Sequence, residues 1–163
     1  PPERITEAAL EAHAEYPEKR IVVHYMTPHR PFIAPEMRHV EGELGHWRGM
    51  IWPGETTAEE IRRAYERNLQ LVLEDVAELL EHVEGRVIVT ADHGELLGER
   101  LRPVPVRCYG HFPSLYVPEL VEVPWVEVPS DERRRIVSEP PAEEFSVDEA
   151  ERTERLRALG YVG

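Results

Sequence analysis

The alternation of apolar and polar residues along the chain predicts two helices. A long apolar stripe follows Thr57 and Glu60, which have the spacing of a capping box, and it predicts a helix over residues 57–83. The stripe consists of Ile61, Tyr65, Leu69, Val72, Val76, Leu79 and Val83. A shorter helix is predicted over residues 3–16, where apolar residues recur at helical spacing between flanking prolines. The chain is therefore expected to begin with one helix and to carry a longer one near its middle.

Two short apolar runs predict buried strands. They are residues 21–26 (Ile-Val-Val-His-Tyr-Met) and residues 87–90 (Val-Ile-Val-Thr). Continuous apolar runs are typical of parallel strands that are covered on both faces. Because a long helix connects the two runs, the pattern favours parallel neighbours joined by a right-handed crossover. The sequence thus predicts an α/β fold with a mostly parallel sheet flanked by helices, in which the loops after both strands leave the same edge.

The segments between and after these elements give weaker signals. Residues 38–53 contain Gly, His and Trp without a period and are expected to form a long loop. Residues 101–129 are rich in proline, and residues 121–126 are expected to form an edge strand interrupted by Pro124. We therefore expect the ordered domain to end near residue 129.

The last part of the chain differs in composition from what precedes it. Residues 130–145 are charged and contain prolines, as in a connecting segment. A short helix is predicted over residues 147–159, with Gly160 as its C-cap glycine. The expected organisation is a domain over residues 1–129 and a charged connection with a C-terminal helix over residues 130–163.

Charge excludes some classes of partner. The chain has 32 Asp and Glu against 19 Lys and Arg, a net charge of -13, which disfavours binding to nucleic acids and to anionic lipid. Apart from Lys19 every basic residue is an arginine. This bias is typical of proteins from a high-salt cytosol, but a GC-rich genome would produce it too, so both interpretations stay open. The single cysteine excludes an internal disulfide, and no apolar run approaches the roughly 20 residues of a membrane span. We expect a cytoplasmic location.

The most informative residues for chemistry follow the second predicted strand. Asp92 and His93 come directly after its apolar run, and Gly94 follows them. A carboxylate oxygen and an imidazole nitrogen beside each other at a strand end are suitable ligands for a catalytic divalent metal ion. The alternative is a surface turn in which Asp92 caps the next segment and His93 is solvated.

Several motifs occur together in a specific order. They are His-Tyr-Met-Thr-Pro-His-Arg-Pro-Phe (24–32), the helix from Ala64 to His82, Val-Ile-Val-Thr-Ala-Asp-His-Gly-Glu (87–95), Tyr-Gly-His (109–111), Val-Pro-Trp (123–125) and Leu-Arg-Ala-Leu-Gly-Tyr-Val (156–162). In these motifs and their order the chain resembles the sulfatases, which belong to the alkaline-phosphatase superfamily. The resemblance implies an alkaline-phosphatase-like fold and metal-dependent hydrolysis of sulfate esters, with a small anionic ester as substrate. The alternatives are a phosphatase, phosphonate hydrolase or phosphotransferase on the same fold, or a noncatalytic sulfatase-like module.

The resemblance also implies that part of the active site lies elsewhere. In sulfatases the first metal carboxylates and the nucleophile precede the matched motifs, and the nucleophile is a Cys or Ser in a C/S-x-P-x-R pattern. Cys108, the only cysteine, stands in Val-Arg-Cys-Tyr-Gly and does not fit that pattern. We therefore expect the chain to be the carboxy-terminal part of a catalytic domain whose amino-terminal strands are missing, and to be inactive alone.

The resemblance assigns roles to four residues. Asp92 and His93 correspond to metal ligands; many sulfatases have Asp-Asn here and bind Ca²⁺, whereas a histidine makes Mn²⁺ or Zn²⁺ at least as suitable. His29 corresponds to a histidine that hydrogen-bonds the transferred sulfuryl or phosphoryl oxygens. His111 falls near a substrate-contacting lysine, so it could contact the substrate, protonate the leaving alkoxide or join the metal ligands.

Simpler roles stay open for several residues. His29 and His111 could be loop histidines held for packing, and His24 is expected to lie in the core. Glu95 could accept a hydrogen bond from His93 or cap the next segment. Arginines that could attract an anion, or form a solvated face, are Arg100, Arg102 and Arg107. Tryptophans that could line a pocket or anchor packing are Trp47, Trp52 and Trp125.

Overall fold

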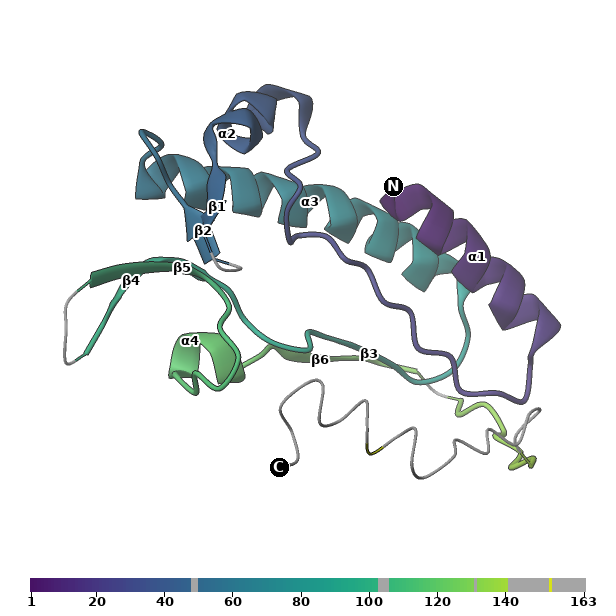
Figure 1. Cartoon of the computed structure of the whole chain (residues 1–163). Helices are drawn as coiled ribbons and strands as arrows, with labels where there is room; N and C mark the ends of the chain where they lie inside the picture. Colours follow the sequence, from purple (N-terminus) through teal and green to yellow (C-terminus); the bar gives the residue numbers. More distant parts are fainter. Residues whose placement is uncertain (48–49, 103–105, 131, 141–152, 154–163) are drawn as a thin grey trace.

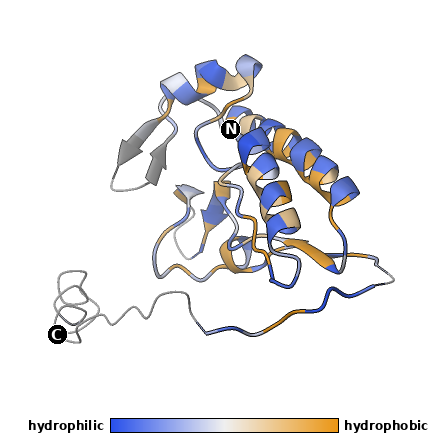
Figure 2. Ribbon diagram, turned by 90° about the vertical axis from the view of Figure 1, so that its right-hand side faces the viewer, coloured by the Kyte–Doolittle hydropathy of each residue, from blue (hydrophilic) through white to orange (hydrophobic). Residues whose placement is uncertain are grey.

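The computed structural model describes residues 1–47, 50–102, 106–130, 132–140 and residue 153. Its longest element is helix α3 (Ala58–His82), against which helix α1 (Pro2–Glu15) packs (Figure 1). Hydrophilic and hydrophobic residues mix along both helices in Figure 2, as expected for amphipathic helices with one face on the protein. Both predicted helices are confirmed to within one residue at each end.

The ends of α3 are set by local sequence. The Thr57 hydroxyl accepts the Glu60 N–H at 3.2 Å, and the Glu60 carboxylate accepts the Thr57 N–H at 2.8 Å. This reciprocal pair satisfies N–H groups that the first turn of a helix leaves unpaired, and the predicted capping box is confirmed. Beyond the other end, Gly85 has a φ of 90°, a conformation that favours glycine and lets the chain turn into the next strand.

The main core cluster lies between α3 and the segment that precedes it. Its buried members are Phe32, Val40, Leu44, Ile61, Ala64 and Tyr109. Ile61 and Ala64 come from α3 and are fully buried. Tyr109 comes from a strand far along the sequence, so one cluster joins the helix, the preceding segment and that strand.

The loop predicted over residues 38–53 is wrong. These residues form the short helix α2 (Arg38–Glu43), which follows a 3₁₀ turn (Pro35–Met37), and a hairpin of β1 (Gly45–Trp47) and β2 (Met50–Trp52). Val40 on α2 is only 1% exposed and belongs to the core cluster with Ile61. A helix this short is stabilised by such burial and not by its own propensity, so the sequence pattern gives little sign of it.

The described strands form three antiparallel pairs, which Figure 1 shows as separate ribbons. The first pair is the β1–β2 hairpin. In the second, β3 (Val87–Thr90) pairs with β6 (Trp125–Val128), and in the third β4 (Leu96–Leu101) pairs with β5 (Val106–Gly110). The strand predicted over residues 87–90 is confirmed in its bounds, but it is only partly buried and its described partner is antiparallel. The β4–β5 hairpin was not predicted, and it carries functional side chains at its base.

The edge strand predicted over residues 121–126 is wrong in its first half. Val121 is the last residue of helix α4 (Pro118–Val121), and β6 begins at Trp125, directly after Pro124. A proline is favourable in the first turn of a helix, which explains Pro118 at the start of α4. Pro124 has no N–H to donate to a ladder, so the strand can start only after it.

The segment over residues 21–26 differs from the prediction most. Its side chains alternate between partly buried and exposed, and Val22 and Met26 are 86% and 67% exposed. It belongs to none of the sheets formed by the described residues, and β3 pairs with β6 and not with this segment. The alternation is that of a strand with one covered face and no hydrogen-bonded neighbour. The mostly parallel α/β sheet stays a prediction.

Residues 132–140 return to the carboxyl end of α1. The Arg134 guanidinium donates hydrogen bonds to the carbonyl oxygens of Pro17, Tyr16 and His13 at 3.0, 3.1 and 3.3 Å. The His13 carbonyl lies in the last turn of α1, where carbonyls lack a partner within the helix, and the other two lie just beyond it. The helix predicted over residues 147–159 lies outside the described residues, apart from residue 153. Among the helices that the structure describes, none is both long and apolar enough to cross a membrane.

Candidate functional site

The four residues assigned from the sequence come from three segments that meet in space. His29 lies in the loop after residues 21–26, Asp92 and His93 lie in the turn after β3, and His111 follows β5 directly. The centroid of the His111 ring is 4.3 Å from that of His93 and 5.3 Å from that of His29. The structure therefore places His111 beside both the other predicted substrate histidine, His29, and one member of the predicted metal pair, His93.

Asp92 and His93 converge as two side chains of one turn. Asp92 Oδ1 accepts the backbone N–H of His93 at 3.0 Å, and its Oδ2 lies 3.7 Å from His93 Nε2. His93 Nδ1 contacts the Gly94 carbonyl at 2.8 Å, so Nδ1 carries the proton and Nε2 keeps a free lone pair. An oxygen and a nitrogen this far apart can bind one cation between them, so the pair fits a divalent metal ion as two of its ligands.

The pKa of Asp92 reflects its neighbours. Partial burial acts to raise it, but the His93 ring, the turn's N–H groups and the His24 ring together hold the Asp92 pKa below its usual value. The N–H groups favour the charged carboxylate by hydrogen bonding, and the two rings favour it when they are protonated. Asp92 is therefore prepared for the anionic form that a metal ligand needs.

Gly94 allows this turn to lie directly on α4. Its N–H donates to the Leu120 carbonyl at 2.9 Å. A Cβ atom at position 94 would collide with the backbone carbonyl of Glu119. The glycine is required by close backbone approach, which fixes the turn that carries Asp92 and His93 against a neighbouring helix.

The loop that carries His29 is attached to α3 through Asn68. This asparagine is fully buried. Its Nδ2 donates to the carbonyls of Pro28 and Pro31 at 3.3 and 3.1 Å, and its Oδ1 accepts the Ile33 N–H at 2.9 Å. Because these partners lie on both sides of His29, one side chain fixes the backbone that positions the imidazole.

A second attachment comes from α2. Arg30 Nη2 lies 2.6 Å from Glu41 Oε1, and the Arg30 side chain is only 7% exposed. Glu41 also accepts the Phe32 N–H at 3.0 Å. The arginine beside His29 therefore holds the loop in a charge-assisted pair.

Glu95 is the residue whose role was predicted least well. Its carboxylate accepts the Nδ1–H of His111 at 2.7 Å, and its side chain is only 6% exposed. Leu96 pairs with Gly110 at the end of the β4–β5 ladder, which places Glu95 opposite His111 one step further on. The sequence suggested contact with His93 or a cap instead. Recognising that residues 96–101 pair with residues 106–110 would have revealed this contact.

His24 was expected in the core, and that prediction is wrong. Its side chain is 63% exposed, and its Nε2 lies 3.8 Å from Asp92 Oδ2. The alternation of residues 21–26 places it on the exposed face, opposite the partly buried Val23 and Tyr25. His24 therefore joins Asp92 and His93 at the candidate site.

The arginines and tryptophans contribute less to this site. Arg107 donates to the Gly98 carbonyl at 2.9 Å, which stabilises its own hairpin. Arg100 and Arg102 are exposed. Trp125 is 63% exposed on β6, while the side chains of Trp47 and Trp52 lie outside the described part of the structure.

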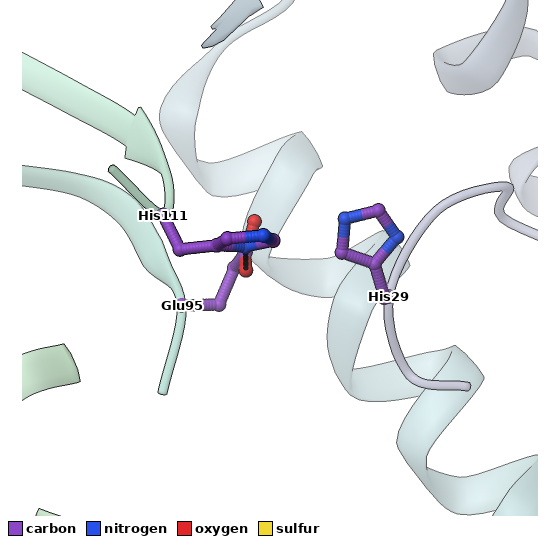
Figure 3. Close-up of side chains that lie close together, drawn as sticks. All are labelled: His29, Glu95 and His111. Atoms are coloured by element: carbon purple, nitrogen blue, oxygen red, sulfur yellow. Dashed lines mark hydrogen bonds and ion pairs between the residues drawn. The ribbon is translucent and has the colours of Figure 1, made fainter. Parts of the chain in front are cut away.

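One group of side chains could hold a metal ion by geometry alone. His29, Glu95 and His111 each offer one ligand atom, and these atoms all lie within 4.8 Å of one another. Figure 3 shows the His29 ring directed toward the space beside His111 and the Glu95 carboxylate. The site thus contains two neighbouring donor groups, joined by the contact between the rings of His93 and His111.

Comparisons with protein-family models, curated proteins and solved structures gave no match for this chain. The resemblance to sulfatases therefore rests on the sequence motifs, and function must be argued from the chemistry of the site. That site offers one carboxylate with a lowered pKa, one buried carboxylate and four imidazoles, an arrangement suited to binding a cation and an anion side by side.

Proposed function

We propose that this chain carries part of the active site of a metal-dependent hydrolase of the sulfatase type, acting on sulfate esters. The observation that supports the proposal is the meeting of His29, the Asp92–His93 turn and His111. The sequence motifs alone assign chemistry to these residues. The residues lie on segments far apart in the chain. If Asp92 and His93 formed only a surface turn, and His29 and His111 were unrelated loop histidines, nothing would require these residues to lie together.

Asp92 and His93 are assigned as ligands of one divalent ion. Asp92 Oδ2 and His93 Nε2 lie 3.7 Å apart, and the His93 tautomer leaves Nε2 unprotonated. Mixed oxygen and nitrogen donors suit Mn²⁺ and Zn²⁺ as well as Ca²⁺. An ion bound there supplies Lewis-acid chemistry, which polarises the ester oxygens and activates a nucleophile.

His29 and His111 are assigned to the anionic ester. In both rings Nδ1 is occupied, by the Arg30 carbonyl in His29 and by the Glu95 carboxylate in His111. The opposite ring nitrogen, Nε2, can donate to an ester oxygen when the ring carries a second proton there, as an imidazolium. Glu95 fixes the orientation of His111, which makes His111 the better candidate to protonate the leaving alkoxide.

The nucleophile must come from outside the residues assigned so far. The thiol of Cys108 contacts the carbonyl oxygen of Val106, two residues earlier in the same strand, at 3.7 Å. Its sequence context also differs from the C/S-x-P-x-R pattern of sulfatases. Two metal ligands are fewer than the three that a catalytic site usually takes from the protein, so a further ligand must join Asp92 and His93 as well.

Phosphoryl transfer is the second candidate, and one observation favours it. His93 stands where many sulfatases have an asparagine, and it brings a softer nitrogen donor to the ion. A phosphatase, phosphonate hydrolase or phosphotransferase would use the same arrangement of Asp92, His29 and His111. The choice between sulfate and phosphate is therefore left to the assay.

The proposal is tested by hydrolysis of 4-nitrophenyl sulfate and 4-nitrophenyl phosphate by the complete gene product. We expect hydrolysis of the sulfate ester that a chelator abolishes and an added divalent ion restores. Asp92→Ala should remove turnover together with the ion that it holds, and His29→Ala should lower turnover at least tenfold. His82→Ala, a histidine on the exposed side of α3, is the matched control.

The assay has three further outcomes. Hydrolysis of the phosphate ester alone would replace the proposal with the second candidate. Hydrolysis of neither ester would point to a noncatalytic module, and hydrolysis that a chelator leaves unchanged would refute the assigned metal pair.

A further inference from the structure

Two donor groups lie side by side at the candidate site, and they differ in composition. Asp92 Oδ2 lies within 4 Å of Nε2 in both His24 and His93, at 3.8 and 3.7 Å. The second group consists of His29, Glu95 and His111, whose ligand atoms lie within 4.8 Å of one another. The proposed function uses the first group for a metal ion and assigns His29 and His111 of the second group to the ester, with Glu95 only orienting His111.

The tautomers of the second group suit metal binding. His29 donates its Nδ1–H to the Arg30 carbonyl at 2.7 Å, which leaves the Nε2 lone pair available. Histidines that bind metals usually donate their other ring N–H to a carbonyl or carboxylate, as His29 does. In His111 the Nδ1 proton lies between the ring and the Glu95 carboxylate at 2.7 Å. Because metal binding releases protons from its ligands, an ion that replaced this proton would contact both His111 Nδ1 and Glu95.

Burial of Glu95 provides a second and independent argument. Its side chain is 6% exposed, and in the described part of the chain its hydrogen-bond partner is the His111 ring. Placing a carboxylate out of water is unfavourable unless a positive charge or several hydrogen bonds compensate. A cation beside Glu95 would supply that compensation.

The three donors are also held in place before any ion binds. His29 lies on a loop that Asn68 and Glu41 attach at several points. Glu95 and His111 face each other across the base of the β4–β5 hairpin, where Leu96 pairs with Gly110. Such attachment lowers the entropy that a site loses when it closes on an ion.

We propose that His29, Glu95 and His111 bind one divalent transition-metal ion, at a site separate from Asp92 and His93. Two imidazoles and a carboxylate favour Zn²⁺, Co²⁺ or Mn²⁺ over Ca²⁺ and Mg²⁺, which prefer oxygen ligands. Donors around a tetrahedral zinc ion lie about 3.4 Å apart, so the 2.7 Å contact between His111 and Glu95 must widen and the widest spacing in the group must close. An ion on Nε2 of His29 takes the position that the proposed function gives to an ester oxygen, so the proposal concerns ion binding by the chain without substrate and does not depend on ester hydrolysis.

The test is titration of the 163-residue chain with Co²⁺, followed by the visible absorption that appears when Co²⁺ enters a low-coordinate nitrogen and oxygen site. We expect the band in the wild-type chain and in Asp92→Asn. His29→Ala, Glu95→Gln and His111→Ala should each weaken binding at least tenfold. Zn²⁺ should displace Co²⁺ and abolish the band, and Ca²⁺ should not.

Two controls keep the test decisive. His82→Ala removes an exposed histidine of α3 and should leave the titration unchanged. Circular dichroism of each variant shows whether it still folds, and Glu95→Gln, which keeps the shape of the side chain, is the variant least expected to unfold.

Three results would overturn the proposal. The first is the absence of any band in the wild-type chain, and the second is an unchanged titration in both Glu95→Gln and His111→Ala. The third is loss of the band in Asp92→Asn, which would move the ion to the first group. None of these results decides whether the complete gene product hydrolyses an ester, so this proposal and the proposed function fail separately.

Discussion

Asn68 on α3 is bonded to the main chain on both sides of His29. Its amide group donates to the carbonyls of Pro28 and Pro31 and accepts the N–H of Ile33, at 3.3, 3.1 and 2.9 Å. The side chain is fully buried. A buried amide that satisfies three backbone groups links the stability of the fold to the position of a candidate catalytic side chain.

Replacing Asn68 should therefore destabilise the protein strongly. Asn68→Ala leaves one N–H and two carbonyl groups without this partner, and we expect the free energy of unfolding to fall by about 2–4 kcal/mol. Asn68→Asp keeps an acceptor for Ile33 but directs a buried negative charge toward two carbonyls, so it should be at least as destabilising at neutral pH. Urea unfolding followed by circular dichroism measures both effects.

Glu66→Ala is the matched control for this prediction, because Glu66 is exposed on the same helix. Its unfolding free energy should change by less than about 0.5 kcal/mol. An Asn68→Ala protein as stable as Glu66→Ala would show that the bonds around His29 contribute little.

Gly94 should tolerate no side chain. A Cβ atom there would collide with the backbone carbonyl of Glu119, and backbone cannot move aside as a side chain can. We expect Gly94→Ala to lower the free energy of unfolding by about 1–3 kcal/mol, since the turn and α4 must separate. Thermal unfolding gives the loss, and titration with Co²⁺ reports whether the neighbouring donors are displaced.

Gly42 provides a control of the same chemical change. It lies in α2, and a Cβ atom added to it would meet nothing within 4 Å. Alanine has the higher helix propensity, so Gly42→Ala should be neutral or stabilising by up to about 1 kcal/mol. Equal losses in the two variants would contradict a structural role for the contact between Gly94 and Glu119.

The sequence predicted those elements that depend on local signals. The capping box at Thr57 and the apolar stripe after it are local, and α3 was placed to within one residue at each end. The apolar run over residues 87–90 is followed by Ala91 and Asp92, and the bounds of this strand were predicted correctly. In both cases the residues that define the element lie within it.

Elements that depend on distant partners were missed. Helix α2 exists because Val40 is buried in the cluster around Ile61, and no pattern within residues 38–53 contains that information. Residues 21–26 have the apolar run of a strand, but a strand also needs a partner, and the described residues give them none. The same reason explains why His24 was expected in the core and lies exposed beside Asp92.

The candidate site was predictable in membership and less so in geometry. Motif order placed His29, Asp92, His93 and His111 in one site, and the structure brings them together. Glu95 was noticed, but its contact with His111 depends on the register of an unpredicted hairpin. Pairing across strands is set by turns and bulges, which a single sequence specifies weakly.

Asp75 should be a source of instability near neutral pH. Its pKa is raised by burial and by the negative charge of Glu3, while the hydrogen bond from Thr6 acts in the opposite direction. A carboxyl group with a raised pKa in the folded state favours folding only when protonated, so its ionisation lowers stability as the pH rises. Asp75→Asn keeps an acceptor for Thr6 and should raise the urea midpoint at pH 7 by the equivalent of at most about 1 kcal/mol.

The gain should disappear in acid, where Asp75 itself becomes neutral. Glu74→Gln, exposed on the same helix, removes a charge at the adjacent position and should change the midpoint less. If Asp75→Asn is less stable than the wild type at pH 7, the ionised carboxylate must stabilise the fold, which contradicts the prediction.

His13 should make the attachment of residues 132–140 sensitive to pH. The Arg134 guanidinium lies 2.5 Å from His13 Nδ1 and can donate to it only while the ring is neutral. Burial, and then the positive charge of Arg134, hold the pKa of His13 below 6.5, although Glu84 acts to raise it. The unfolded chain therefore binds a proton at His13 more readily than the folded protein does.

The sign of the effect follows from that difference. A histidine with a lowered pKa stabilises the fold above its unfolded pKa of 6.5, and this contribution is lost as the pH falls toward the folded pKa. Since the chain has 8 histidines, the measurement must compare the wild type with His13→Gln, which cannot be protonated. We expect the melting temperature of the wild type to fall more than that of His13→Gln between pH 7.5 and pH 5.5.

In Arg134→Ala the guanidinium is absent, so the fall in melting temperature should be smaller than in the wild type. An equal fall in wild type and His13→Gln would show that the contact between His13 and Arg134 does not couple proton binding to stability.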